Sequence, residues 1–338
     1  MKIQENILLK DHTTFRIGGK ADFFVEVNTI DELKEAILFS KKDKIPFIVI
    51  GGGSNILASD SGFRGLVIRN NIKGIEWKTD GDFVSVISNA GESWDYLVDL
   101  TVKEGLFGLE NLSLIPGSVG ASPIQNIGAY GAEVKQTIDW VEAMDTEKME
   151  LIVLNSKQCE FGYRDSIFKH EIGKKYIVTR VAFKLKRSGD TFIGYHDLAD
   201  YFVRRGIARA TPKEVRDAVI EIRTNKLPDI RVEGTAGSFF KNPIVTRERF
   251  DELKKMFSDI SGYASDGAMK ISAGWIIDKL LGLKGYFEGD AGVHPKQALV
   301  LVNKGNATAK DIKNLAEKIE KMTKEKIGIE LEREVREI

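Results

Sequence analysis

The hydrophobic pattern of the chain changes after its first third, and this change constrains the fold more than any single motif does. Residues 21–27, ADFFVEV, predict a strand, and residues 29–43 predict a helix with Thr29 as its N-cap. Residues 45–57, IPFIVIGGGSNIL, predict a buried strand that enters a glycine turn. This beginning is βαβ-like, but no GxGxxG precedes a helix, so a Rossmann fold is only weakly supported.

From about residue 65 to residue 186 the predicted segments are mostly strands: LVIRN, FVSVISNA, WVEAMD, LIVLN and YIVTRVAFKLK. One helix is expected over residues 93–105, with Ser93 as its N-cap. Strands that follow one another with so few helices favour an antiparallel sheet. This part of the chain therefore predicts an α+β fold.

The second half opens with a polar, arginine-rich segment, and a helix then starts at Thr211 and Pro212. An exposed loop should follow and lead into a further module. The predicted elements of this module are helices over residues 247–257, 272–282 and 308–326 and strands over 298–303 and 327–338. The last strand should return to an earlier sheet, because an isolated strand is unstable.

Composition limits the possible functions. The 338 residues suit two or three domains, and Lys and Arg (50) balance Asp and Glu (50), so a general attraction to nucleic acid is not expected. Cys159 is the only cysteine, which excludes an internal disulfide and fits a reducing cytosol. No apolar run reaches the roughly 18 residues of a membrane span, and no zinc-ligand spacing is present. We expect a cytoplasmic protein without a metal site.

Two glycine-rich stretches are candidates for phosphate binding. In Ile50–Asn55, IGGGSN, three adjacent glycines can turn several backbone N–H groups toward one anion, and a tight turn is the alternative. Ile115–Gly131, IPGSVGASPIQNIGAYG, has a composition that suits backbone lying against an extended ligand, and a buried loop of small residues is the alternative. In this second stretch, Gln125 and Asn126 could contact a heteroaromatic edge. Together the stretches suggest a dinucleotide such as FAD, although their spacing does not separate FAD from NAD.

Several polar residues are candidates for chemistry. Arg164, between Tyr163 and Asp165, could hold a carboxylate, or it could form a surface ion pair with Asp165. Ser238, in GTAGSFFKNP, could bond the local backbone or present a proton at a fixed point. Strand alternation places Glu332 and Glu334 on one face, where solvated carboxylates are the default interpretation.

Nine segments in the same order as in one family span nearly the whole chain: TTFRIGGKADF, IGGGSNIL, LIPGSVGASPIQNIGAYG, FGYRDSIFK, RTNKLPD, GTAGSFFKNP, KISAGWIID, HPKQALVLVN and LEREV. With these segments the chain resembles the UDP-N-acetylenolpyruvoylglucosamine reductases, the MurB flavoenzymes of bacterial peptidoglycan precursor synthesis. Each segment is weakly specific, but all nine together are highly specific.

The resemblance implies the FAD-binding α+β fold shared with flavin oxidases (PCMH-like), followed by an α+β substrate domain. The implied domains are residues 1–68 and 69–226 for FAD, with residues 327–338 packing back on the first, and residues 227–326 for the UDP-sugar. It also implies that NADPH reduces the FAD and that hydride then passes to the enolpyruvyl ether of UDP-N-acetylglucosamine. A proton at the alpha carbon completes UDP-N-acetylmuramate. We further expect a monomer.

The resemblance assigns roles to individual positions. The catalytic residues are Arg164 at the substrate carboxylate, Ser238 as proton donor and Glu334. The expected cofactor-binding residues are Ile50, Gly51, Gly52, Gly53, Ser54, Asn55, Pro116, Gly117, Ser118, Gly120, Ala121, Ser122, Gln125, Asn126, Gly128 and Ala129. The expected substrate-binding residues are Tyr163, Tyr195, Lys226, Asn242, Tyr263 and Lys270.

Tyr195 is typical of the family branch whose longer loop closes over the substrate, although His196 stands where that branch more often has glycine. Two alternatives to the reductase are open. One is a flavin oxidase of the same fold acting on a sugar or an alcohol, and the other is a binder of flavin or UDP-sugar without catalysis. Neither explains why the YRDS, SFFKNP and EREV segments occur together.

Overall fold

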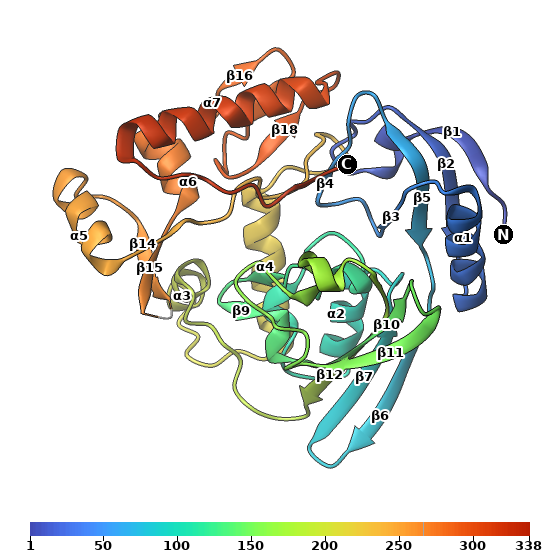
Figure 1. The fold of residues 1–338 in the computed structure, drawn as a ribbon. Helices are drawn as coiled ribbons and strands as arrows, with labels where there is room; N and C mark the ends of the chain where they lie inside the picture. Colours follow the sequence, from blue (N-terminus) through green and yellow to red (C-terminus); the bar gives the residue numbers. More distant parts are fainter. Residues whose placement is uncertain (266) are drawn as a thin grey trace. The chain divides into compact units, whose positions relative to one another are not determined.

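The structure is a computed structural model that describes residues 1–265 and 267–338 (Figure 1). The described residues form two compact units. Unit 1 contains Met1–Ile7, Ala21–Gly52 and Arg64–Asn225, and unit 2 contains Leu8–Lys20, Gly53–Phe63 and Lys226–Ile338. Residues 1–68 thus contribute to both units, and the division into three domains stays a prediction.

The first sheet of unit 1 has the strand order β1-β2-β5-β3, and its strands β3 and β5 run parallel. The strands are β1 (Gln4–Leu8), β2 (Lys20–Val27), β3 (Phe47–Ile50) and β5 (Phe63–Asn70), and the helix α1 spans Ile30–Asp43. Thr29 caps α1 as predicted, since its side chain accepts a hydrogen bond from the Glu32 amide. Leu33 and Ile37 of α1 pack with β2 and β5 in one apolar cluster.

The second sheet of unit 1 has the order β11-β10-β12-β7-β6, and its neighbouring strands are antiparallel, as the sequence predicted. Its strands are β6 (Ile75–Asp80), β7 (Phe83–Asn89), β10 (Ile138–Asp145), β11 (Glu150–Asn155) and β12 (Tyr176–Lys186). The helix α2 (Trp94–Lys103) packs on this sheet through Trp94, Leu97 and Val98. Ser93 occupies the N-cap, but its side chain makes no capping hydrogen bond, so this part of the prediction is wrong.

Two further helices of unit 1 pack against each other, α3 (His196–Val203) and α4 (Pro212–Lys226). Leu198 and Phe202 of α3 meet Val215 and Val219 of α4 in a separate apolar cluster. Tyr130, at the end of the second glycine-rich stretch, packs against the same cluster. Short strands within that region are β8 (Gly128–Ala129) and β9 (Ala132–Glu133).

Unit 2 contains the sheets β13-β15-β14, β16-β17-β18 and β19-β4. Their strands are β4 (Ile56–Leu57), β13 (Ile244–Val245), β14 (Gly262–Ser265), β15 (Ala268–Ile271), β16 (Phe287–Glu288), β17 (Ala291–Val293), β18 (Leu301–Asn303) and β19 (Arg336–Glu337). The helices are α5 (Arg247–Met256), α6 (Ala273–Trp275), which continues as a π-helical turn over Ile276–Leu280, and α7 (Ala309–Ile327).

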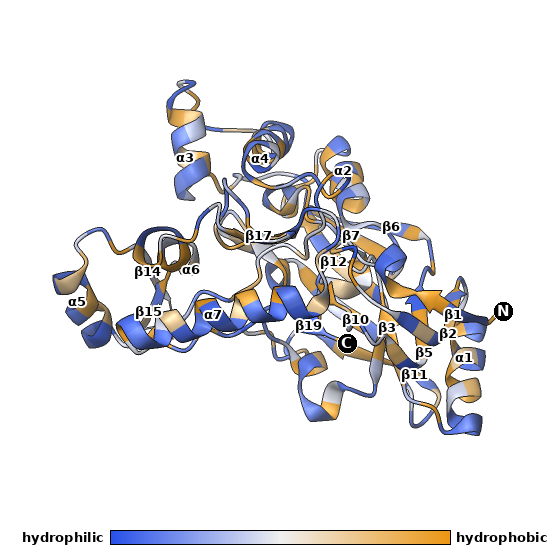
Figure 2. Cartoon of the chain, turned by 90° about the horizontal axis from the view of Figure 1, so that it is seen from above, coloured by the Kyte–Doolittle hydropathy of each residue, from blue (hydrophilic) through white to orange (hydrophobic). Residues whose placement is uncertain are grey.

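The helix α7 shows why unit 2 has a core. Thr308 and Asp311 form a capping box at its start, and Gly328 ends it in a left-handed conformation. Ile312, Leu315 and Ile319 recur at helical spacing and are fully buried. The rest of α7 is mainly hydrophilic, as Figure 2 shows, so this helix turns one apolar stripe to the core and the remainder to water.

The predicted long strand over residues 327–338 is wrong. Within it only β19 is a strand, and it pairs in parallel with β4. A two-residue strand gives no alternation over residues 330–334, so side chains there are positioned by individual contacts instead.

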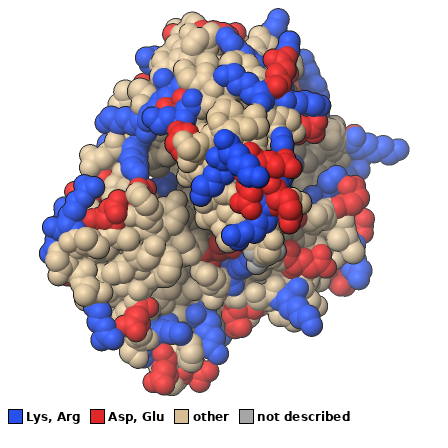
Figure 3. Space-filling view, turned by 90° about the vertical axis from the view of Figure 1, so that its left-hand side faces the viewer, with Lys and Arg blue, Asp and Glu red and all other residues tan. Residues whose placement is uncertain are grey.

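Charged residues of both signs are interspersed on the face of the molecule in Figure 3. No large field of one sign stands out there, in keeping with the balanced composition. Among residues 1–265 and 267–338, no helix is both long and apolar enough for a bilayer span.

Candidate functional site

The two glycine-rich stretches lie directly against each other in unit 1. A Cβ atom at Gly51 would lie 2.1 Å from Ser118 Oγ, and one at Gly52 would lie 3.2 Å from Gly117 Cα. Larger residues at 51 and 52 would therefore push the stretches apart. From the sequence, these glycines indicated either a tight turn or an anion nest. The structure gives a third reason for glycine at these positions, which is the close contact between the two stretches.

The end of the first stretch belongs to unit 2. Gly53 has a φ of +65°, and a Cβ atom there would lie 2.1 Å from the carbonyl oxygen of His12. The Asn55 side-chain amide donates to the carbonyl oxygen of Glu334 at 3.2 Å, and the Arg336 amide donates to the Asn55 carbonyl oxygen at 3.0 Å. Asn55 thus anchors the C-terminal segment that carries Glu334.

Within the second stretch, Asn126 and Ser122 differ in their hydrogen bonding. The Asn126 side-chain amide donates to Glu133 Oε2 at 3.1 Å and to the Gly162 carbonyl oxygen at 2.8 Å. Both of its donors are therefore used by the protein, which argues against the expected side-chain contact with a heteroaromatic edge. Ser122 is 1% exposed, and its hydroxyl has no hydrogen-bond partner among the described residues.

An unpartnered buried hydroxyl is unusual, because leaving such a group unsatisfied costs roughly 1–3 kcal/mol. The Ser122 hydroxyl is therefore available to a polar group of a ligand. A serine hydroxyl without a protein partner among the described residues, in a stretch of small residues, suits contact with a dinucleotide. The residues present therefore fit FAD.

Arg164 rests on the same stretch. Its Nη2 donates to the Gly128 carbonyl oxygen at 2.8 Å, and its guanidinium lies 5.5 Å from the centre of the Tyr163 ring. The Arg164 backbone has a φ of +53°, a left-handed conformation that is costly for a residue with a side chain. Asp165 pairs with His170, with Oδ2 and Nε2 2.8 Å apart. The guanidinium is thus positioned at the glycine-rich stretch.

Tyr195 precedes α3 as its N-cap residue and is 41% exposed. Its ring packs edge-to-face on Tyr130, with ring centres 5.6 Å apart. Unit 1 therefore brings together the start of the first glycine-rich stretch, the second stretch, Arg164 with Tyr163, and Tyr195.

Ser238 is exposed in unit 2, while the two residues after it are buried. Phe239 and Phe240 are each 1% exposed, and their rings meet edge-to-face at 5.2 Å. The Phe239 amide donates to the Leu299 carbonyl oxygen at 2.8 Å. Buried aromatic side chains and a backbone bond fix the chain on the C-terminal side of Ser238, as the sequence suggested.

Glu334 lies beside this segment. The Glu334 amide donates a hydrogen bond to the carbonyl oxygen of Phe239 at 2.8 Å. Its backbone partner is therefore the residue directly after Ser238. Glu332 instead forms an ion pair with Lys241. Alternation could not separate the two glutamates, and the assignment of Glu334 as the catalytic one stays a prediction.

Three expected substrate-binding residues gather in unit 2. The Asn242 side-chain amide donates to the Tyr263 hydroxyl at 3.2 Å, and Lys270 Nζ lies 5.6 Å from the centre of the Tyr263 ring. Tyr263 and Lys270 are partners on β14 and β15. Lys270 is only 7% exposed, so it is not a solvated surface lysine. Lys226 is half-buried at the end of α4.

The sequence interpretation gave no role to two half-buried polar residues of unit 1, Tyr130 and Arg223. Burial lowers the pKa of the Arg223 guanidinium, and the nearby Tyr130 and Asp95 partly offset this effect. Burial also raises the pKa of Tyr130 to about 12. A signal was available: Arg223 follows Val219 by four residues and so lies on the apolar face of α4.

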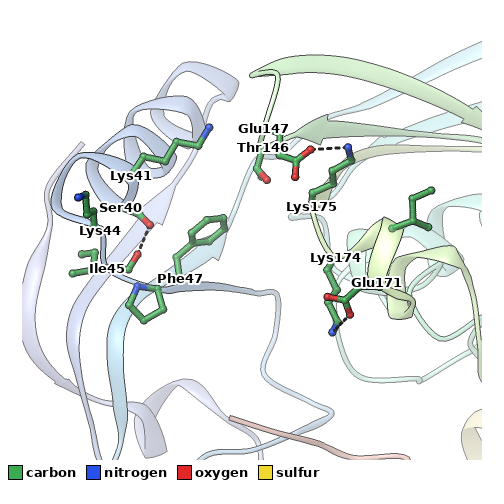
Figure 4. Close-up of a pocket in the computed structure, with 12 residues that line it drawn as sticks. Ser40, Lys41, Lys44, Ile45, Phe47, Thr146, Glu147, Glu171, Lys174 and Lys175 are labelled. Carbon is green, nitrogen blue, oxygen red and sulfur yellow. Dashed lines mark hydrogen bonds and ion pairs between the residues drawn. The ribbon is translucent and has the colours of Figure 1, made fainter.

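A surface pocket in unit 1 has no part in this chemistry (Figure 4). The end of α1 and residues 45–47 line one side of it, and residues 146–147 and 171–175 line the other. Two ion pairs lie in its wall: Lys175 Nζ is 2.8 Å from Glu147 Oε2, and Lys174 pairs with Glu171. It contains none of the expected site residues. Among the described residues, no group of three or more His, Cys, Asp and Glu side chains is placed to hold a metal ion.

Comparison with known proteins gives matches over both parts of the chain. The family model of an FAD binding domain matches residues 21–153, which include both glycine-rich stretches. The model of the UDP-N-acetylenolpyruvoylglucosamine reductase C-terminal domain matches residues 229–338.

Relatives match over the full length. A UDP-N-acetylenolpyruvoylglucosamine reductase of Flavobacterium johnsoniae is 44% identical over 338 residues and covers 99% of each chain. That of Pseudomonas syringae pv. syringae is 43% identical, covering 99% of this chain and 98% of the relative. The crystal structure of MurB from Thermus caldophilus matches with a TM-score of 0.69 and 28% identity, over 100% of this chain and 99% of that one.

The fold and the matched domain define an α+β flavoprotein that binds FAD, which confirms the predicted fold class and cofactor. The chain belongs to the UDP-N-acetylenolpyruvoylglucosamine reductase (MurB) family of oxidoreductases, as its sequence motifs indicated.

Proposed function

We propose that the chain reduces the enolpyruvyl ether of UDP-N-acetylglucosamine to UDP-N-acetylmuramate, with NADPH as reductant, in peptidoglycan precursor synthesis. The observation that carries this proposal is the place of Arg164: its guanidinium donates to Gly128 in the stretch that we assign to FAD. A cation at that point can hold the carboxylate of an acid next to the flavin.

FAD, held by residues of the two glycine-rich stretches, Ser122 among them, supplies the hydride when it is bound. Arg164 binds the substrate carboxylate and stabilises the negative charge that develops there when hydride adds to the enolpyruvyl double bond. This contact favours the transition state over the ground state, because the charge on the substrate grows during the step.

Ser238 donates the proton to the alpha carbon. A serine hydroxyl is a weak acid, so it can serve only a strongly basic centre, and its position must be fixed. The buried Phe239 and Phe240 support that position. Glu334, one residue away in the backbone pairing, acts with Ser238 in this proton transfer.

The residues that we assign to UDP-sugar binding are Tyr163, Tyr195, Lys226, Asn242, Tyr263 and Lys270. In this group Lys270 is the cation best suited to a phosphate, because it is buried next to Tyr263 and a buried charge gains strongly from a counter-ion. On the basis of Tyr195, we also assign the chain to the family branch whose longer loop closes over the substrate. We further propose that the protein acts as a cytoplasmic monomer, which sedimentation of the purified protein would test.

The direct test separates the two half-reactions. The purified flavoprotein is reduced anaerobically with NADPH and then mixed with enolpyruvyl-UDP-N-acetylglucosamine. Rapid recovery of the flavin absorbance is expected. Recovery only after oxygen is admitted would support the sugar or alcohol oxidase, and absence of reduction by NADPH would support a binder without catalysis.

The same experiment tests Ser238. Ser238→Ala should leave flavin reduction by NADPH nearly intact and slow reoxidation by the enolpyruvyl substrate by about 10²-fold or more, the usual worth of a positioned proton donor. An equal loss in both half-reactions would argue against proton donation by Ser238.

A further inference from the structure

Leu114 has a left-handed backbone conformation directly before the second glycine-rich stretch. Its φ is +59°, and the residue is 37% exposed. This conformation is costly for a residue with a side chain, and a side chain that stays partly in water gains little from packing to offset the cost. The conformation must therefore be held by contacts of the backbone.

The first turn of α2 supplies these contacts. Trp94 donates from Nε1 to the Leu112 carbonyl oxygen at 2.8 Å and from its amide to the Gly117 carbonyl oxygen at 3.1 Å. Between these two points, the Leu114 amide donates to Asp95 Oδ1 at 2.5 Å. A hydrogen bond to a carboxylate is stronger than one between neutral groups, so Asp95 is the residue that holds the Leu114 backbone most firmly.

Arg216 of α4 fixes the Asp95 carboxylate in the position that the Leu114 amide needs. Its Nη1 donates to Asp95 Oδ1 at 2.7 Å and its Nη2 to Asp95 Oδ2 at 3.1 Å, and this two-point contact sets the plane of the carboxylate. Arg216 is buried, and its Nε lies 3.3 Å from Asp99 Oδ1. To turn away from Leu114, the Asp95 carboxylate would have to give up both bonds to Arg216, and breaking a buried ion pair is costly.

We propose that Asp95, held by Arg216, is a positioning residue for FAD. It keeps Leu114 in the left-handed conformation, and Leu114 sets the direction in which the second glycine-rich stretch leaves α2. This inference rests on the assignment of that stretch to FAD. NADPH and the enolpyruvyl substrate have no part in its test, so a failure of the proposed reduction and a failure of the positioning role are separate results.

Release of FAD from the purified holoprotein tests this role. After dilution, the rise in flavin fluorescence gives the dissociation constant. Asp95→Ala removes the acceptor of the Leu114 amide and should raise this constant by about tenfold or more, the effect of one hydrogen bond to a charged group. Asp99→Ala is the matched control, because it also takes a carboxylate from Arg216 but leaves the Leu114 bond in place. It should leave the dissociation constant unchanged.

Leu114→Gly separates positioning from a general loss of structure. Glycine adopts a positive φ without the steric cost that leucine has, so it needs no partner to hold it there. Asp95→Ala should therefore raise the dissociation constant several-fold less in a Leu114→Gly protein than in the wild-type protein. If the ion pair were merely structural, the loss of FAD affinity would be the same in both backgrounds.

Leu114→Val and Leu114→Asn test the same conformation with the Asp95–Arg216 pair intact, and they decide the matter should Asp95→Ala fail to fold. A β-branched side chain disfavours the left-handed region strongly, whereas asparagine tolerates it. Leu114→Val should bind FAD several-fold more weakly than Leu114→Asn does. Equal affinity in these two variants would overturn the role given to the Leu114 backbone.

Hydrogen exchange in the FAD-saturated holoprotein separates the local contact from its effect on FAD. The Leu114 amide should exchange at least about tenfold faster in Asp95→Ala than in the wild-type protein, since its acceptor is gone. Unchanged exchange would overturn the role of Asp95 in holding Leu114. Faster exchange with an unchanged dissociation constant would overturn the link to FAD, and so would an equal loss of FAD affinity in Asp99→Ala.

Discussion

Replacing Gly51 by alanine should weaken FAD binding because it forces the two glycine-rich stretches apart. The new Cβ atom would lie 2.1 Å from Ser118 Oγ and 3.1 Å from Ser118 Cβ. Carbon atoms in ordinary contact are roughly 3.5–4.0 Å apart, so rotation of the hydroxyl alone cannot remove the overlap. One of the stretches must move.

The cost of such overpacking is about 1–3 kcal/mol. If FAD binds only to the arrangement seen here, the whole cost falls on the complex, and each 1.4 kcal/mol is tenfold in affinity. The expected loss is therefore about 5- to 150-fold in the affinity for FAD.

The assay is titration of the apoprotein with FAD, followed by quenching of flavin fluorescence. Gly274→Ala serves as the matched control, since a Cβ atom there would meet nothing closer than 3.5 Å. Ser118→Ala removes Oγ, the nearer of the two clashing atoms. The loss of FAD affinity caused by Gly51→Ala should therefore be smaller in a Ser118→Ala protein than in the wild-type protein. Wild-type affinity in Gly51→Ala, or no relief in the double variant, would refute the steric reasoning.

Two predictions concern stability. Leu315→Ala should lower the free energy of unfolding by about 2–5 kcal/mol, because Leu315 is fully buried in unit 2. Lys321→Ala, at an exposed position on the same helix, should change it by less than about 0.5 kcal/mol. Urea denaturation would measure both values. Burial raises the pKa of the Cys159 thiol from 9.0 to about 12, so native protein should react with a thiol reagent far more slowly than unfolded protein. The thiol of the unfolded chain ionises at lower pH than the buried one, so the free energy of unfolding should fall as the pH rises from 9.0 to about 12. Cys159→Ala should make this fall less steep. A pH dependence of stability that Cys159→Ala leaves unchanged would contradict the prediction.

Local sequence patterns predicted helices and strands well where the buried residues follow the hydrophobic pattern. Residues 176–186 form the expected strand β12, and Thr29 caps α1, because alternation and capping depend on nearby residues. The strand β6 was missed because its residues are largely exposed and polar at the edge of the sheet. The prediction for the end of the chain failed for a different reason. Residues 328–335 are held by single contacts with distant segments, such as the hydrogen bond from the Glu334 amide to the Phe239 carbonyl oxygen.

The candidate site was predicted through motifs, and its geometry was beyond local sequence signals. The Arg164 guanidinium meets Gly128, 36 residues earlier in the chain, and no periodicity indicates that approach. Likewise, only the folded chain brings Lys241 to Glu332, 91 residues further along, where the two form an ion pair. Contacts of this kind are set by tertiary packing, so a sequence pattern can name the residue types but not their partners.

Glycine-rich stretches illustrate this limit, because a missing side chain can make room for a ligand or for another part of the chain. At Gly51, Gly52 and Gly53 the space belongs to the protein: each Cβ atom would meet Ser118, Gly117 or His12. The glycines are thus explained without any ligand, and by themselves they no longer argue for one. The buried hydroxyl of Ser122 is different, since no protein contact among the described residues satisfies it. The structural argument for FAD in this chain therefore rests more on one unpartnered serine than on the glycines that first drew attention to these stretches.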